Sequence, residues 1–562
     1  MSGGERKPSI FSQIEMRFST YILMVFASLV VFGIVLPTLI LVTFGEMLAS
    51  MALAVYLVPI IAITAVAALP LLLVGRKRKE IEHLMPLFVT RMAALSTSDM
   101  QPEKLFHMLS TCREYGQLAK DSGKIYRLVK DYHMPVAEAC RFIAARSASH
   151  LEADFFSRLS HAIDVGERLE RFLKNEQDVI MDEYTLKCEA AIKDMDFLKE
   201  IFTSIVISLV FIAVFISIVP LLAPQNIKLL VMSIIAIFAS VELLFLLLMY
   251  MRVPKDTIWY QWSLKWKEGF MTDADRMLIA SIVIAVACVV FLALFLSIIP
   301  IPIPLYISSI FLPLLIPGML IMKEERKIER RDNIYGAFLR ALGRSGDVTG
   351  QTMTESVKKL ALHKFGPLTE FVRNLERRLS MRISTMDSWR HFASEANSNL
   401  IKKFGEMYIH STINGARPEP TSLFISNNMS RILAVRKKRL ILAGNYVGIL
   451  YGIMVAVSFT LFSTVGILEY MGNMISSLIP PDADIMSFGI LSAIYEAKFA
   501  VADLTMMVYA VIVVHAAVSS VILVILKGGH LAGAVVYFVS MVWIGVATSV
   551  VVDALITGML VV

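Results

Sequence analysis

Apolar stretches of about 20 residues recur along the chain, and they constrain its fold more than any other feature. A hydrocarbon core roughly 30 Å thick is crossed by about 20 residues of α-helix. Only 18% of the 562 residues are charged, against roughly 25% in soluble proteins. Because lipid leaves backbone groups unsatisfied outside helices and closed barrels, we predict an all-α polytopic membrane protein. We expect nine spans: Tyr21–Phe44, Met51–Val74, Ile201–Ala223, Ile227–Tyr250, Leu278–Ile299, Ile301–Met322, Leu440–Gly466, Leu504–Leu526 and Leu531–Val552.

Two long hydrophilic segments, residues 76–200 and 323–439, separate these spans. Both contain proline, glycine and capping residues that mark helix starts and ends, and neither shows the strand-like alternation of polar and apolar residues. In each segment a glycine comes shortly before a final helical stretch that leads into a span. Glycines and phenylalanines fall into register at an offset of roughly 245 residues, which predicts a duplicated helical module. The paired positions are Gly123 and Gly366, Phe142 and Phe392, and Gly166 and Gly415.

The predicted organisation follows from these spans and segments. It comprises a polar start with two spans (1–75), a first helical module (76–200), four spans with a short loop at 251–277 (201–322), a second helical module (323–439) and three final spans (440–562).

Basic residues flanking the spans predict the orientation in the membrane. Lys and Arg are enriched in cytoplasmic segments of membrane proteins, and they are concentrated in the amino terminus, both modules and the 251–277 loop. The segments on the opposite side contain one clear basic residue, Lys498. We therefore expect the amino terminus and both modules in the cytoplasm and the carboxyl terminus outside.

The second module is strongly basic. It contains 23 Lys and Arg against 12 Asp and Glu, whereas the first contains 20 against 21. Such an excess fits contact with the inner leaflet, nucleic acid or an acidic protein partner. Nucleic acid is disfavoured because aromatic residues are not interleaved with the basic ones. Basic clusters beside the spans are expected to anchor the chain at lipid headgroups: Arg76, Lys77, Arg78 and Lys79, and Arg436, Lys437, Lys438 and Arg439.

Arg373, Arg377 and Arg378 lie far from any span in sequence. Positions 373 and 377 carry like charges one helical turn apart, which are mildly destabilising by themselves. Two hypotheses remain open for these three arginines: a solvated helix face, or a face that docks an acidic partner.

The sequence contains no motif for a cofactor, a metal or nucleotide hydrolysis. The stretch Gly343–Thr352 has glycines spaced like a phosphate loop but lacks the lysine and the preceding strand that such a loop needs. A glycine-rich linker between helices is the better interpretation. Glu242 is the clearest ionisable residue inside a predicted span. Such a group is either functional or satisfied by a partner that locks helices together.

The residues Leu84–Ser98 resemble the opening of the cytoplasmic domain in archaellum platform proteins, relatives of the inner-membrane platforms of type II secretion and type IV pili. The stretch from Ala337 to Ala393 is similar to the second copy in that family. The family has Gly-Glu after its helical hairpin, which Gly166 and Glu167 match, whereas Gly415 is followed by alanine.

This resemblance implies a non-enzymatic membrane platform that acts as a homodimer. A hexameric cytoplasmic ATPase would act on the modules, and the spans would lift pilin-like subunits from the bilayer into a filament. Rotation of the filament is a further implication of the archaellum family. The alternatives are the platform of a non-rotating adhesion pilus and, from a different class, a polytopic transporter that uses Glu242.

Overall fold

The computed structural model describes residues 75, 77–98, 100–218, 227–253, 256–260, 273–296, 303–349, 352–478 and 489–560. These residues are almost entirely helical, and the single β-bridge among them joins Trp259 and Ser398. The predicted all-α class is therefore confirmed. Contacts divide the chain into two compact units: the first comprises Met1–Tyr184 and His410–Ile425, and the second comprises Thr185–Ile409 and Ser426–Val562.

Six helices in the described part of the chain are long and apolar enough to cross a membrane. They match six of the nine predicted spans, and the first two predicted spans lie outside the described residues. The remaining predicted span, Ile301–Met322, is not among these six helices. It is divided into α13 (Ile303–Phe311), a 3₁₀ turn (Leu312–Leu314) and the start of α14 (Leu315–Thr349). Pro313 in the turn has no backbone N–H to continue the helical ladder.

The first module begins with a helix over residues 77–96. Four shorter helices follow: α5 (Pro102–Thr111), α6 (Gly116–Tyr132), α7 (Val136–Ala144) and α8 (His150–Asp164). Pro102 occupies the first turn of α5, where its missing N–H is tolerated. The core of this module is aromatic, with Phe106, Phe155 and Phe156 all at most 1% exposed.

The second module repeats this order of helices. After α14 come α15 (Met353–Leu360), α16 (Thr369–Ser380), α17 (Thr385–Ala396) and α18 (Asn399–Ile413). The side chain of Thr352 accepts a hydrogen bond from the backbone N–H of Glu355, so this residue caps α15 as its spacing predicts. The expected linker Gly343–Thr352 is wrong for most of its length, because α14 stays helical to Thr349.

Side-chain contacts confirm the duplication and place its offset at about 250 residues. Phe88 makes an edge-on contact with Tyr115 at 5.7 Å in the first module, and Phe338 makes the same contact with Phe365 at 5.3 Å in the second. A glycine with positive φ follows each second aromatic, Gly116 (51°) and Gly366 (53°). The predicted pairing of Gly123 with Gly366 is therefore wrong, since Gly123 lies inside α6.

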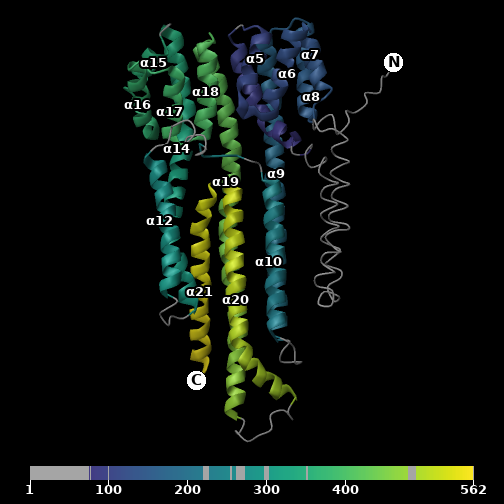
Figure 1. The fold of residues 1–562 in the computed structure, drawn as a ribbon, viewed down its shortest axis with the longest axis vertical. Coiled ribbons are helices and arrows are strands. Elements are labelled where there is room, and N and C mark those ends of the chain that lie inside the picture. The colour runs from purple at the N-terminus through teal and green to yellow at the C-terminus, as the bar shows by residue number, and fades with distance from the viewer. Residues whose placement is uncertain are drawn as a thin grey trace, which may run out of the picture. The chain divides into compact units, whose positions relative to one another are not determined.

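Each module ends in a very long helix. Helix α9 runs unbroken from Leu169 to Ile218, and α19 runs from Pro418 to Leu478 (Figure 1). Both include an apolar segment of spanning length. The predicted continuity from module helix to span is thus present in both copies.

The other long helices are α10 (Ile227–Arg252), α12 (Asp273–Leu296), α20 (Gly489–Lys527) and α21 (Ala534–Leu560). Within the second unit, α10 packs along α20 (Figure 1). One continuous apolar core joins residues of α9, α10, α19, α20 and α21, including the fully buried Phe202, Tyr446 and Met541. Many apolar side chains on the outer faces are exposed, as expected for surfaces that meet lipid.

Candidate functional site: a buried polar junction

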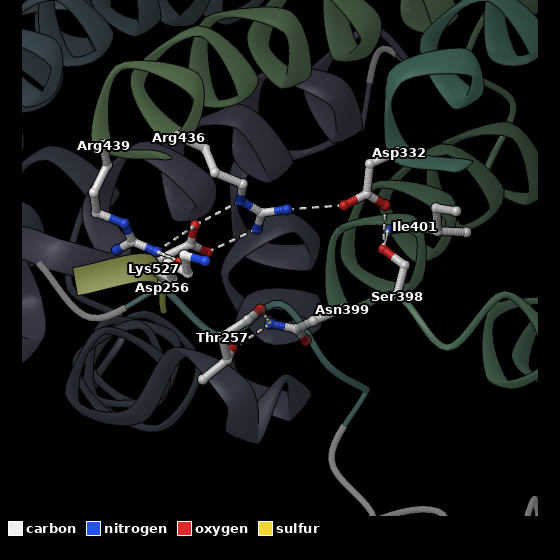
Figure 2. A network of polar contacts seen from close by, with 9 residues as sticks. All are labelled: Asp256, Thr257, Asp332, Ser398, Asn399, Ile401, Arg436, Arg439 and Lys527. Carbon is white, nitrogen blue, oxygen red and sulfur yellow. Dashed lines mark hydrogen bonds and ion pairs between the residues drawn. The ribbon is translucent and has the colours of Figure 1, made fainter. Parts of the chain in front are cut away.

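A network of charged and polar side chains lies inside the second unit, centred on Arg436 of α19 (Figure 2). Its guanidinium donates from Nε and Nη2 to the two carboxylate oxygens of Asp256, at 2.7 and 2.9 Å. Its Nη1 donates to Asp332 of α14 at 2.8 Å. Two planar groups joined by paired hydrogen bonds have a fixed mutual orientation. Arg436 therefore fixes α19 to both the short loop and the first helix of the second module.

Asp332 extends the network into α18. The hydroxyl of Ser398 donates to its second carboxylate oxygen, and the same hydroxyl accepts from the backbone N–H of Ile401 at 3.1 Å. Ser398 thereby satisfies one of the backbone donors that a helix start leaves unpaired. Asp332 and Ser398 are fully buried, so this connection is shielded from water.

The short loop is attached to the module by backbone and side-chain hydrogen bonds. Asn399 donates from Nδ2 to both the carbonyl and the hydroxyl of Thr257, at 3.1 and 2.6 Å (Figure 2). Two backbone bonds flank this contact, from Asn399 to Ile258 and from Tyr260 to Asn397, each at 3.1 Å. Residues 256–260 are thus tied to the α17–α18 turn.

A second arginine connects the junction to the turn that follows α20. Arg439 donates to the backbone carbonyl of Lys527 at 3.0 Å and lies 3.6 Å from Asp256. The next residue, Gly528, has φ of 72°, and a Cβ there would lie 2.0 Å from the Arg439 guanidinium. Glu325 holds the same turn, because it accepts from Trp259 Nε1 at 3.0 Å and from the His530 backbone at 2.7 Å.

Burial governs the electrostatics of the junction. It raises the pKa of Asp332 to about 6, although Arg436 and Ser398 favour the ionised form. Burial alone would lower the pKa of Arg436, but Asp256 and Asp332 raise it above its ordinary value. The hydroxyl of Ser398 and the carboxylate of Asp332 form a pair, but both are fully buried, and the described residues include no cluster that could hold a metal. Its chemistry is that of a structural joint between five chain segments.

These positions correct the prediction for the second basic cluster. Arg436 and Arg439, expected at lipid headgroups, are buried and paired with acidic or carbonyl groups. Lys437 and Lys438 are exposed as expected, and Lys438 forms an ion pair with Glu189. The reason is helical periodicity: positions 436 and 439 share one face of α19, and positions 437 and 438 lie on the other.

In the first basic cluster, Arg76 lies outside the described residues. Arg78 and Lys79 are exposed, and Arg78 pairs with Glu82 one turn further along at 2.8 Å. Lys77 is partly buried and lines a cavity of the first module. Anchoring of this cluster at lipid headgroups remains a prediction.

The three arginines proposed to dock a partner differ in their surroundings. Arg373 and Arg377 are exposed on α16, whereas Arg378 is half-buried and forms an ion pair with Glu395 of α17. The exposed basic face is therefore made by Arg373 and Arg377, with Arg378 positioned by the module itself.

The two glycine turns have the same geometry. Gly166 and Gly415 adopt positive φ of 75° and 92°. The residue after each glycine donates its backbone N–H to a carbonyl five residues earlier: Glu167 to Ala162 at 2.9 Å, and Ala416 to Ser411 at 3.0 Å. These are helix-terminating motifs that favour glycine. The glutamate side chain is exposed in the first copy, so the turn itself does not depend on it.

Glu242 has a partner that sequence reasoning did not assign to it. Its Oε1 lies 2.7 Å from Nδ1 of His515, and both side chains are fully buried between α10 and α20. The ring of Phe202 stacks against the imidazole with centroids 6.2 Å apart. The pair thus connects two membrane helices through an apolar core.

Sequence reasoning also missed Asp256, Asp332 and Ser398. One signal existed: arginine rather than lysine at positions 436 and 439, since arginine is the residue suited to buried, bidentate carboxylate pairs. No local pattern indicates which carboxylates these would be, because Asp256 is 180 positions from Arg436 in sequence.

A duplicated helical module that continues into spanning helices defines a class of polytopic membrane platform, and comparisons with known proteins agree. The family described as "Type II secretion system (T2SS), protein F" matches residues 88–219. "Flagella accessory protein J" of Methanocaldococcus jannaschii is 32% identical over 532 residues, covering 91% of this chain and 92% of that protein. The protein of the same name from Methanococcus voltae is 31% identical over 517 residues, covering 88% and 91%.

The chain belongs to the flagella accessory protein J family of archaellum platform proteins. It is therefore a multi-pass membrane protein of the archaeal filament machinery. No solved structure matches the chain.

Proposed function

We propose that this platform transmits mechanical work from a cytoplasmic hexameric ATPase to the membrane, where pilin-like subunits enter a growing archaellum. The observation that carries the proposal is the unbroken course of α9 and α19, from a glycine turn in each module to an apolar span. A continuous helix resists bending, so a displacement at one end moves the other. The chain itself has no motif for nucleotide hydrolysis, and the energy must come from a partner.

Within the first unit, both long helices contact the segment that begins with the helix over 77–96. Gln177 of α9 donates from Nε2 to the Thr90 hydroxyl at 2.6 Å. The hydroxyl oxygens of Thr97 and Thr421, the latter in the first turn of α19, are 3.1 Å apart and buried. The pKa of Glu170, in the first turn of α9, is lowered by a hydrogen bond from Lys174 and also by Arg417, which precedes α19. A partner that moves this region would therefore act on α9 and α19 together.

The proposed orientation of the protein in the membrane follows from the distribution of basic residues. Both modules and the amino terminus would lie in the cytoplasm, and the carboxyl terminus would lie outside. The platform would act as a homodimer. The predicted organisation into segments 76–200 and 323–439, with spans before and after each, belongs to the same proposal.

The exposed face of Arg373 and Arg377 supports docking of an acidic surface of the ATPase. Two exposed cations on one helix face raise the association rate of an acidic partner and contribute affinity. Detergent-solubilised protein should therefore retain a secretion-type ATPase from the same organism on co-purification. Changing both arginines to glutamate should reduce retention by at least about tenfold, since like charges across an interface cost several kcal/mol.

A matched control separates a specific face from net charge. Lys358 and Lys359 are exposed on α15 of the same module, and changing both to glutamate alters the net charge equally. This control should retain the ATPase. Equal loss in both double variants would show that docking responds only to overall charge, and full retention in both would remove these arginines from the interface.

Pairing of Glu242 with His515 favours a structural role over ion coupling. A buried carboxylate in a membrane bundle needs a partner, and the imidazole provides one from the neighbouring helix. This pairing weakens the transporter alternative, which depended on Glu242. The shared name of the relatives, flagella accessory protein, favours an archaellum over an adhesion pilus.

A further inference from the structure

A small charged cavity lies within the first module. Its volume is about 150 Å³, smaller than the roughly 300–1,000 Å³ of sites for drug-sized ligands. It therefore suits one compact group. Three cationic side chains line it, contributed by the helix over 77–96, by α6 and by the α7–α8 turn: Lys77, Lys124 and Arg146.

One carboxylate among the lining residues is already engaged. Asp121 of α6 accepts from Gln117 at 2.9 Å and lies 3.0 Å from Lys124. Arg146 is held in place because its guanidinium lies over the ring of Phe142, with the Cζ atom 3.6 Å from the ring centroid. The three cations and Asp121 together leave the cavity with a net positive charge.

A second carboxyl group lies behind the cavity wall. Glu152 of α8 is fully buried, and the hydroxyl of Ser147, which lines the cavity, donates to its Oε2 at 2.6 Å. Its Oε1 is buried and accepts no hydrogen bond from any residue that the structure describes. Burial, followed by the charge of Asp121, raises the pKa of Glu152 to about 8. Glu152 is therefore mostly neutral at pH 7, and it does not cancel the positive charge.

We propose that this cavity binds a phosphate group, supplied by the headgroup of an anionic phospholipid at the inner surface of the membrane. Lysine and arginine side chains bind phosphate oxygens in many proteins. Lys77 stands three residues after the predicted span Met51–Val74, so the sequence predicts that this end of the module lies near the inner surface of the membrane. A basic pocket beside a span on the cytoplasmic side is a typical site for such headgroups.

The test uses the full-length protein in detergent and two probes, short-chain phosphatidylglycerol and inorganic phosphate. Binding of each is measured by native mass spectrometry or calorimetry. Lys124→Gln and Arg146→Gln should each weaken phosphatidylglycerol binding by about fivefold, because each removes one basic group near the phosphate. Lys120→Gln, an exposed position one turn away on α6, should bind like the unchanged protein. Arg146→Lys keeps the charge and should retain most of the affinity.

The pH dependence supplies a readout that a merely structural role would not produce. Asp121, Lys124 and Ser147 are the charged and polar groups that face Glu152. Binding of the phosphodiester should weaken as the pH rises through about 8, because ionised Glu152 then adds a negative charge. In Glu152→Gln this loss should disappear.

The possible outcomes distinguish a lipid headgroup, a free phosphate and the absence of a phosphate site. Tight phosphatidylglycerol binding with weak phosphate binding supports the lipid source, and equal binding of both probes supports a free phosphate at the same site. Equal affinity in Lys124→Gln, Arg146→Gln and Lys120→Gln, or no binding of either probe, would overturn the proposal. Melting temperatures of the variants show whether each remains folded, and none of these measurements depends on ATPase docking.

Discussion

Replacing Arg436 with methionine removes the centre of the polar junction while keeping an unbranched side chain of similar length. Asp332 is fully buried and loses its only cationic partner among the described residues, whereas Asp256 keeps Arg439 at 3.6 Å. Breaking a buried ion pair by removing one member costs roughly 3–5 kcal/mol, because the other charge is left uncompensated. We expect Arg436→Met to lower the free energy of unfolding by about that amount.

The assay is unfolding of the purified protein in detergent, followed by circular dichroism across a denaturant series. Lys437→Met is the matched control, because this neighbour on α19 is exposed and surface substitutions usually change stability by less than about 0.5 kcal/mol. Adding Asp332→Asn to Arg436→Met should restore part of the loss, because the orphaned charge is gone. Two results would refute the reasoning: equal stability of the Arg436 and Lys437 variants, or full additivity of the two substitutions in the double variant.

Three further predictions follow from other contacts. Burial raises the pKa of Asp332 to about 6, so the folded protein holds this proton more tightly than the unfolded chain. The protonated carboxyl therefore contributes up to roughly 3 kcal/mol to the free energy of unfolding in acid, and this contribution is lost as the pH rises through 6. The free energy of unfolding of Asp332→Asn, measured across pH 4–8, should lack this pH dependence. Glu242→Leu should destabilise by about 1–3 kcal/mol because His515 loses its buried partner, and the double leucine variant should recover most of it; an equally unstable double variant would count against pairing as the cause. Gly415→Ala should lower the free energy of unfolding by about 1–2 kcal/mol, because φ is 92° at this position. Gly444→Ala, at a helical position with open space around it, should be neutral or stabilising. Equal melting temperatures of the two variants would contradict this.

The sequence predicted those parts of the fold that depend on local pattern. Apolar length located the spans, and the glycines at 166 and 415 located the turns before the long helices, since a helix-ending residue with positive φ favours glycine. Hydropathy alone did not indicate the 3₁₀ turn within the predicted span at 301–322, where Pro313 interrupts the helical hydrogen bonds. The repeat was recognised, but its register required the aromatic contacts of Phe88 and Phe338.

The candidate site was not predictable from local pattern. A basic run such as Arg436–Arg439 is typical of an anchor at the membrane surface. The structure shows that its two arginines are buried on one face of α19 and that its two lysines are exposed on the other face. Asp332 reaches Arg436 across 104 positions of sequence. Likewise, the partner of Glu242 lies 273 positions away. Pairings of this kind depend on tertiary packing.

If α9 and α19 carry displacement from the modules into the membrane as rigid rods, interrupting one of them should abolish filament assembly. A Gly-Ser-Gly-Ser insertion after Lys199 breaks α9 within its continuous course, and the same insertion after His133 lengthens an exposed turn between α6 and α7. With both variants present in the membrane at normal levels and still retaining the ATPase, filaments counted by electron microscopy should be absent for the Lys199 insertion and present for the His133 insertion. Normal filaments on cells carrying the Lys199 insertion would contradict rigid coupling.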